Sequence, residues 1–193
     1  MFNIRRMEPK DLIDIQKCNQ YNLPENYPMT FWLYSVVTWP EASFLAEDSR
    51  RKIVGYVLAS VEQAEDNDST WVGHINSLGV LRSYRRLGLA KRLMTLSKDS
   101  MMDAYPLQYI QLQVRTSNRA ALSLYRDALG YTVYSVDHRY YADGEDAFSM
   151  RLWINGVPHT PRPRWKMFGT IHQFVVRKHR QLVHCFRRTR SLP

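Results

Sequence analysis

The stretch RRLGLAKRLM, residues Arg85 to Met94, places two arginines and a glycine directly before an amphipathic run. A helix N-terminus presents unpaired backbone N–H groups and the positive end of the helix dipole. Gly88 has no Cβ and lets the backbone approach a ligand, while Arg85 and Arg86 add full charges beside those amides. The combination predicts a phosphate or diphosphate site. The alternative is a solvated basic turn before an ordinary helix.

Hydrophobic patterning on both sides of this stretch predicts an α+β domain with one mixed, mostly antiparallel sheet. The predicted order is one strand, two helices, three strands, helix, strand, helix and two strands. These elements cover residues 2–6, 8–20, 30–39, 43–48, 52–62, 71–81, 87–104, 109–115, 117–130, 132–141 and 147–153.

Turn and cap signals set the boundaries of these elements. Thr30 is a candidate N-cap for the second helix, and Ser117 or Asn118 for the last one, which Gly130 ends. The polar, acidic residues 63–70 are expected to form a loop.

The positive charge of the chain belongs to its C-terminal part. Residues 151–193 contain ten Arg or Lys and no Asp or Glu, whereas the first 150 residues hold 17 basic and 18 acidic groups. We therefore predict a domain over 1–153 and a basic extension over 154–193 with one possible helix.

The two cysteines, Cys18 and Cys185, form neither a disulfide framework nor a metal motif. We therefore expect no bound metal, and we expect the protein to reside in a reducing compartment. The N-terminus has no apolar signal region, and no run reaches about 18 apolar residues. Nothing in the sequence indicates secretion or membrane insertion.

Two motifs together carry a resemblance to a known superfamily. The spacing Arg85-x-x-Gly88-x-Ala90 after a strand resembles the pyrophosphate loop of the GNAT-type acetyltransferases, which bind acetyl-coenzyme A. The stretch SNRAALSLYRDALGY (residues 117–131) resembles their second cofactor motif. The resemblance implies the GNAT fold and a set of cofactor-binding residues. They are Leu78, Gly79, Val80, Arg85, Arg86, Gly88, Leu89, Ala90 and Asn118.

A closer resemblance covers roughly residues 1–152. The stretches LPENY (23–27), GHINSLGVLRSYRRLGLAKRLM (73–94), VRTSNRAALSLY (114–125) and YYADGEDAFSM (140–150) are similar to the catalytic subunits of eukaryotic N-terminal acetyltransferase A complexes. That resemblance implies acetylation of the α-amino group of nascent chains in the cytoplasm. It also implies a helical-repeat auxiliary subunit that wraps the catalytic one.

The reaction requires a neutral amine, and an α-amino group with a pKa near 8 needs only a modest base. The resemblance assigns Glu25 as the carboxylate near the amine; otherwise it is an exposed loop residue. His74 is a second candidate proton acceptor, or else a satisfied strand histidine. If strand alternation holds, His74 shares a face with Asn76 and Leu78, and Ile75 with Ser77. Which of Glu25 and His74 is the main base stays open.

Further roles follow from the same resemblance. Backbone N–H groups of Leu78 to Val80 would stabilise charge on the thioester oxygen, if the sheet splays there. Tyr125 would hydrogen-bond or protonate the leaving sulfur, the alternative being a core aromatic. Tyr27, Tyr140 and Tyr141 would contact the peptide, although adjacent tyrosines in a strand point to opposite sides.

Two further assignments concern single side chains. Arg115 could pair with a nearby acid or shape the peptide slot, and Cys18 is expected to be a packed helix residue. Transfer in this superfamily is direct, without an acyl-enzyme.

The basic extension fits contact with ribosomal RNA, a solvated segment, or a helix that docks on the domain or a partner. Three functions stay open. They are an α-amino acetyltransferase of nascent chains, a lysine or small-amine acetyltransferase, and a non-catalytic RNA-binding adaptor that retains a coenzyme A site.

Overall fold

The computed structural model describes residues 2–64 and 67–154. Its strands are β1 (Asn3–Arg6), β2 (Phe44–Glu47), β3 (Ile53–Ala64), β4 (Asn67–Val80), β5 (Leu107–Arg115), β6 (Thr132–Asp137) and β7 (Ala147–Trp153). Its helices are α1 (Leu12–Asn22), α2 (Met29–Thr38), α3 (Leu89–Ala104) and α4 (Arg119–Ser123). Short helical turns cover η1 (Pro9–Asp11), η2 (Arg82–Tyr84) and the π-helical η3 (Leu124–Ala128).

The seven strands form one sheet in the order β1-β2-β3-β4-β5-β7-β6. Only β4 and β5 pair in parallel, and every other neighbouring pair is antiparallel. The α+β class, the order of elements and the mixed, mostly antiparallel sheet are therefore confirmed for the described residues.

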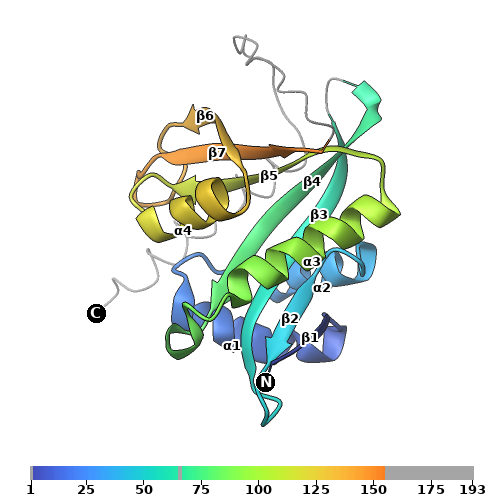
Figure 1. Cartoon of the computed structure of the whole chain (residues 1–193), viewed down its shortest axis with the longest axis vertical. Coiled ribbons are helices and arrows are strands. Elements are labelled where there is room, and N and C mark those ends of the chain that lie inside the picture. Colours follow the sequence, from blue (N-terminus) through green and yellow to red (C-terminus); the bar gives the residue numbers. More distant parts are fainter. Residues whose placement is uncertain (1, 65–66, 155–193) are drawn as a thin grey trace, which may run out of the picture.

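Helices cover both faces of this sheet (Figure 1). On one face, α3 contributes Leu89, Leu93, Met94 and Met101 to a core shared with Val57 and Ile75. On the other face, α1 and α2 bury Ile15, Cys18 and Trp32 against Tyr56 and Leu58. The sheet is thus the middle layer, and β3 and β4 lie at its centre.

The buried apolar side chains of α3 are Leu89, Leu93, Met94 and Met101, whereas Leu96 is 39% exposed. The helix also begins at Leu89 rather than Leu87, because Gly88 is its left-handed N-cap.

Two local predictions were wrong. Thr30 lies inside α2, because the extended Pro28 is the N-cap and its carbonyl accepts the N–H of Phe31 and Trp32. The loop expected over 63–70 is mostly strand, since β3 continues to Ala64 and β4 begins at Asn67. The predicted helix in the basic extension lies outside the described residues.

Candidate active site

Strand β4 carries a bulge at Asn76 that changes which side chains share a face. Leu58 of β3 lies opposite Ser77, and the next residue, Ala59, lies opposite Ile75, so Asn76 is the extra residue. His74 and Asn76 still lie on the same side of the sheet. Ser60 of β3 lies opposite His74, and its Oγ accepts a hydrogen bond from Asn76 Nδ2 at 2.9 Å. Simple alternation nevertheless fails beyond this point.

Because of the bulge, the side chains after Asn76 lie on other faces of the sheet than predicted. Ser77 turns toward the α1–α2 side, where its hydroxyl lies 2.8 Å from that of Tyr56. Ile75 and Leu78 pack together in the opposite core. The prediction that Leu78 joins His74 and that Ser77 joins Ile75 was therefore wrong.

Strands β4 and β5 part at this bulge. Their parallel pairing ends at Ile75 and Leu112, although β4 continues to Val80 and β5 to Arg115. Leu81 donates its N–H to Val54 of β3 at 2.8 Å, so Val80 turns its amide and carbonyl to the opposite, open edge. Leu78, two residues earlier, has the same orientation. This splay leaves backbone N–H groups of β4 available for an oxygen atom.

The turn before α3 has the backbone of an anion site. Gly88 has φ +76° and Arg86 has φ +66°, both in the left-handed region. Among the described residues no side chain caps this helix, whose first internal bond runs from Arg92 N to Gly88 O. The amides at the start of α3 thus stay available for phosphate oxygens.

The two arginines of this turn differ in their surroundings. Arg85 Nε donates to the Val80 carbonyl at 3.0 Å, and its Nη2 donates to Asn22 Oδ1 at 2.9 Å. Arg86 is exposed, and its side chain makes no hydrogen bond or ion pair within residues 2–64 and 67–154. Arg85 therefore braces the open edge of β4, whereas Arg86 carries the freer charge.

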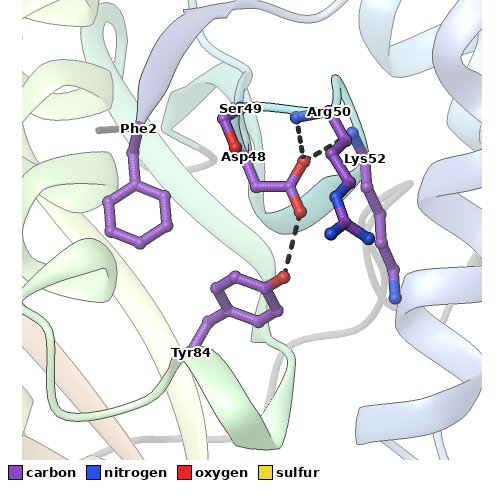
Figure 2. A pocket seen from close by; sticks show the side chains of 6 residues that line it. All are labelled: Phe2, Asp48, Ser49, Arg50, Lys52 and Tyr84. Atoms are coloured by element: carbon purple, nitrogen blue, oxygen red, sulfur yellow. Dashed lines mark hydrogen bonds between the residues drawn. The ribbon is translucent and has the colours of Figure 1, made fainter.

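A carboxylate on the β2–β3 turn anchors the segment just before these arginines (Figure 2). Asp48 Oδ2 accepts the Tyr84 hydroxyl at 3.0 Å, and its Oδ1 accepts the N–H groups of Arg50 and Lys52. Phe2 packs edge-on against the Tyr84 ring. This contact fixes η2, and with it the start of the arginine turn.

Glu25 lies in the α1–α2 loop and is paired with Arg115 at the end of β5. Its Oε1 accepts Arg115 Nη2 at 2.7 Å and Nε at 3.1 Å. Arg115 Nη1 also contacts Asp143 and Glu145 at 2.8 and 2.7 Å. Within the described residues Glu25 Oε2 makes no hydrogen bond, so one carboxylate oxygen is left for an amine.

Tyr27 and Tyr141, both predicted to bind the peptide, lie near Glu25. The Arg115 guanidinium lies 4.0 Å above the Tyr141 ring. Tyr27 donates its hydroxyl to the Asn76 carbonyl at 3.1 Å, which joins the Glu25 loop to the bulge of β4. Burial, and to a smaller extent the charge of Glu25, raises the pKa of Tyr27 to about 12.

Tyr140 and Tyr141 lie in the loop between β6 and β7, not in a strand. Their rings meet edge to face with centroids 5.1 Å apart. Strand pleating therefore does not send the two rings to opposite sides, contrary to the prediction, because β6 ends at Asp137.

His74 is buried on β4, 7% exposed. Its Nδ1 lies 3.0 Å from Gln111 Nε2, and its Nε2 lies 3.9 Å from Glu62 Oε2. The contacts described for His74 thus differ from those of Glu25, and Ser60, which lies opposite His74 on β3, accepts a hydrogen bond from Asn76 Nδ2.

Tyr125 lies in η3 and is 8% exposed. Its hydroxyl makes no hydrogen bond within residues 2–64 and 67–154, and burial raises its pKa to about 12. The phenol therefore keeps its proton near neutral pH and can donate it to a ligand. Asn118 is the N-cap of α4, and its Oδ1 accepts the Ala121 N–H at 3.1 Å.

Comparisons with known proteins agree with this geometry. The model of the acetyltransferase (GNAT) family matches residues 10–131. The chain belongs to the GNAT family. The resemblance inferred from the arginine turn and the second cofactor motif is thereby confirmed.

This GNAT protein is similar to catalytic subunits of N-terminal acetyltransferase A complexes. It is 49% identical over 148 residues to the N-terminal acetyltransferase A complex catalytic subunit ard1 of Schizosaccharomyces pombe, covering 77% of this chain and 83% of the relative. It is 49% identical over 156 residues to the catalytic subunit NAA10 of the same complex in Arabidopsis thaliana, covering 81% and 80%.

A solved structure shares the fold. A chain from the crystal structure of a NatC complex bound to Gag peptide and CoA superposes with a TM-score of 0.74 at 25% identity. The match covers 80% of this chain and 99% of that one.

GNAT acetyltransferases use acetyl-coenzyme A, and the residues present here fit it. The uncapped turn at Gly88 offers amides to a diphosphate, the open edge of β4 offers N–H groups to a carbonyl, and the Tyr125 hydroxyl is unpartnered within the described residues.

Within residues 2–64 and 67–154, no helix has both the length and the apolar character needed to span a membrane.

Proposed function

We propose that this chain transfers the acetyl group of acetyl-coenzyme A to the α-amino group of peptide N-termini. One observation carries the proposal: Tyr27 Oη is bonded to Asn76 O, at the point where β4 leaves β5. This contact holds the loop that carries Glu25 next to the place where β4 and β5 separate, which is the proposed cofactor site. The two catalytic subunits reported above, each 49% identical to this chain, support the same activity.

On the cofactor side, backbone groups carry most of the binding. Acetyl-coenzyme A supplies the activated acetyl group as a thioester. The amides of Gly88, Leu89 and Ala90, with the exposed charge of Arg86, bind its diphosphate. The N–H groups of Leu78 and Val80 donate to the carbonyl oxygen as negative charge develops on it.

On the amine side, Glu25 Oε2 accepts a hydrogen bond from the incoming amino group while Arg115 holds Oε1. Since an α-amino group has a pKa near 8, a usable fraction is neutral at pH 7. The carboxylate orients that amine and passes its proton toward solvent. Tyr27 and Tyr141, which lie near Glu25, contact the peptide around that amine.

The Tyr125 hydroxyl donates a hydrogen bond to the departing sulfur, because it stays protonated. Cys18, the one free cysteine among the described residues, is buried, and burial raises its pKa to about 11. A covalent acyl-enzyme at this thiol is therefore disfavoured, and transfer goes directly to the amine.

We further propose that this chain acts in the cytoplasm as the catalytic subunit of a larger complex with a helical-repeat auxiliary subunit. Apolar side chains exposed on α1 and α2 support such a partner: Ile13, Tyr21, Leu33, Tyr34 and Val37. We also propose that the basic extension, residues 154–193, contacts ribosomal RNA; residues 155–193 lie outside those that the structure describes.

The direct test is mass spectrometry of peptides after incubation with acetyl-coenzyme A and this chain. Peptides beginning with Ser, Ala or Glu and carrying one internal lysine locate the acetyl group. N-terminal acetylation supports the proposal. Lysine-only modification supports the second function, and cofactor binding without turnover in every complex tried supports the adaptor.

The role of Glu25 is tested by Glu25→Gln. We expect kcat to fall about 100-fold with an unchanged KM for acetyl-coenzyme A. Asp14→Asn is a matched control, because Asp14 is an exposed acid on α1 paired only with Lys17 in the described contacts. Wild-type turnover in Glu25→Gln would remove Glu25 from the mechanism.

A further inference from the structure

Asn19, on α1, is a polar side chain with no exposed surface. Its Nδ2 donates to the Glu25 carbonyl at 3.0 Å and to Asn26 Oδ1 at 2.9 Å. Its Oδ1 accepts the Tyr56 hydroxyl at 2.6 Å. A buried carboxamide with both ends bonded is held in one orientation.

The loop that carries Glu25 depends on Asn19 for its own main chain. Pro24 and Pro28 bracket it, and a proline has no N–H to donate. Asn19 also accepts the N–H of Leu23 through its main-chain carbonyl, at 2.9 Å. Asn19 thus holds the loop at two points. Its main-chain carbonyl binds Leu23, before Glu25, and its side chain binds the carbonyl of Glu25 itself.

Tyr56 of β3 extends this contact to the cofactor strand. Its side chain is fully buried, and its hydroxyl lies 2.8 Å from Ser77 Oγ on β4. The same ring packs so closely on Gly79 that an added Cβ would come within 2.7 Å of Cε1. Burial raises the pKa of Tyr56, so the hydroxyl keeps the proton that it donates to Asn19.

A continuous chain of hydrogen bonds therefore runs from β4 to the Glu25 loop. Because the Tyr56 hydroxyl donates to Asn19, it accepts from Ser77, and Asn19 in turn donates to the Glu25 carbonyl. The chain begins beside Leu78 to Val80 and ends at the main chain of Glu25. It connects the two halves of the site through the protein interior.

We propose that Asn19 is a positioning residue that fixes the Glu25 main chain against the sheet, and that the Tyr56 hydroxyl fixes Asn19. The proposal rests on the function proposed above, because it acts through Glu25. Neither side chain needs to touch substrate. Their effect is on where the carboxylate stands relative to the thioester carbonyl, and misplacement by about 1 Å can cost a factor on the order of 100 in rate.

Two variants test the proposal with the full chain. Tyr56→Phe removes one hydroxyl and keeps the ring that packs on Gly79 and Trp32. Asn19→Asp keeps the acceptor for Tyr56 but places an oxygen against two oxygens of the loop. We expect kcat to fall about 10-fold for Tyr56→Phe and about 100-fold for Asn19→Asp, with KM for acetyl-coenzyme A unchanged.

Ser97→Ala is the matched control for loss of a buried hydrogen bond. Ser97 is also fully buried, and its hydroxyl donates to the Ala42 carbonyl at 2.6 Å on the opposite face of the sheet. It should lower the thermal midpoint as Tyr56→Phe does and leave kcat unchanged. An equal loss of kcat in Ser97→Ala would show that stability alone explains the effect, and would overturn the proposal.

A double-mutant cycle with Glu25→Gln decides between positioning and a general structural role. If Asn19 and Tyr56 act through the carboxylate, Tyr56→Phe costs little further kcat in the Glu25→Gln background. Additive losses would overturn the proposal. If Asn19→Asp does not fold, the Tyr56→Phe cycle decides alone.

The two proposals can fail separately. Wild-type turnover in Glu25→Gln would contradict the proposed role of Glu25, and with it the positioning of that residue. A large loss in Glu25→Gln together with wild-type kcat in Tyr56→Phe would contradict only the positioning role.

Discussion

Tyr125 shows how burial prepares a single side chain for chemistry. Its hydroxyl is unpartnered within the described residues, and burial raises its pKa to about 12. A thiol has an ordinary pKa near 8.5, well below that of this phenol, so Tyr125 keeps its proton and donates a hydrogen bond to the leaving thiolate over the whole neutral range. The Tyr125 hydroxyl can thus donate a hydrogen bond, and it does not lose its proton below about pH 11.

Tyr125→Phe should therefore lower kcat about 100-fold with little change in the KM for the peptide. In wild type, kcat/KM should rise with pH as the amine loses its proton near 8, and then stay level to about pH 10. Steady-state rates between pH 6 and 10 check both. A falling limb between pH 8 and 10 that vanishes in Tyr125→Phe would contradict the raised pKa.

At this scale, motifs supplied the candidate residues that are proposed to face the ligands, but not the residues that hold those candidates in place. Glu25 and Tyr27 came from LPENY, whereas Asn19, Tyr56 and Glu62 were not predicted. A weak signal existed, because Asn19 lies four residues after Ile15 on the buried stripe of α1. A polar residue on an apolar helix face must find a partner, but only the folded chain shows that the partner is Tyr56.

At the scale of elements, the cofactor site depends on the backbone of α3 and β4. Gly88 has φ +76°, and a Cβ added there would meet no atom within 4 Å. Substitution therefore strains the turn without a clash, at a cost of about 1 kcal/mol. The charge of Arg86 acts on the same ligand by a different route.

Arg86→Ala and Gly88→Ala should each raise the KM for acetyl-coenzyme A several-fold, at unchanged kcat. The Arg86→Ala effect should shrink as salt rises from 0.05 to about 0.5 M, because exposed charges are screened. The Gly88→Ala effect should persist, because it is conformational. Arg85→Ala should also lower kcat, since Arg85 braces Val80. An unchanged KM in the Arg85→Ala/Arg86→Ala double variant would contradict phosphate binding here.

Elements of regular period were predictable and departures from it were not. In β5, the buried residues Ile110, Leu112 and Val114 alternate with half-buried ones, as the two-residue period of a strand requires. The bulge at Asn76 and the splay after Ile75 were not predictable, because neither Gly, Pro nor a change of hydrophobic pattern marks them. Both arise from pairing with other strands.

For the whole molecule, Arg115 joins segments that are distant in sequence. It contacts Glu25, 90 residues earlier, and Glu145, 30 residues later. Hydrogen bonds from Ser117 and then from Arg115 lower the pKa of Glu145 to about 2. A carboxyl group whose pKa falls on folding stabilises the folded state only while it is ionised.

Glu145→Gln should therefore lower the thermal midpoint by the same amount at pH 7 and pH 5. The difference from wild type should shrink as pH falls below 4.5 toward 2, where wild-type Glu145 becomes protonated. Scanning calorimetry at pH 7, 5, 4 and 3 checks this. A difference that stays constant down to pH 3 would show that the pKa is not lowered.

The order of elements was predictable from the sequence because helices and strands differ in hydrophobic period. The meeting of the Glu25 loop with the β6–β7 loop was not, because it follows from the strand order β5-β7-β6. That order places the segment before β7 beside the end of β5. Arg115 itself was only a weak candidate until both loops were in place.

The most direct measurement is a crystal structure of this chain with coenzyme A and a peptide. The diphosphate should contact the amides from Gly88 to Ala90, the sulfur should lie within hydrogen-bond distance of Tyr125 Oη, and the peptide amine should face Glu25. Density for the diphosphate elsewhere, with the start of α3 empty, would contradict the proposed transfer at its foundation.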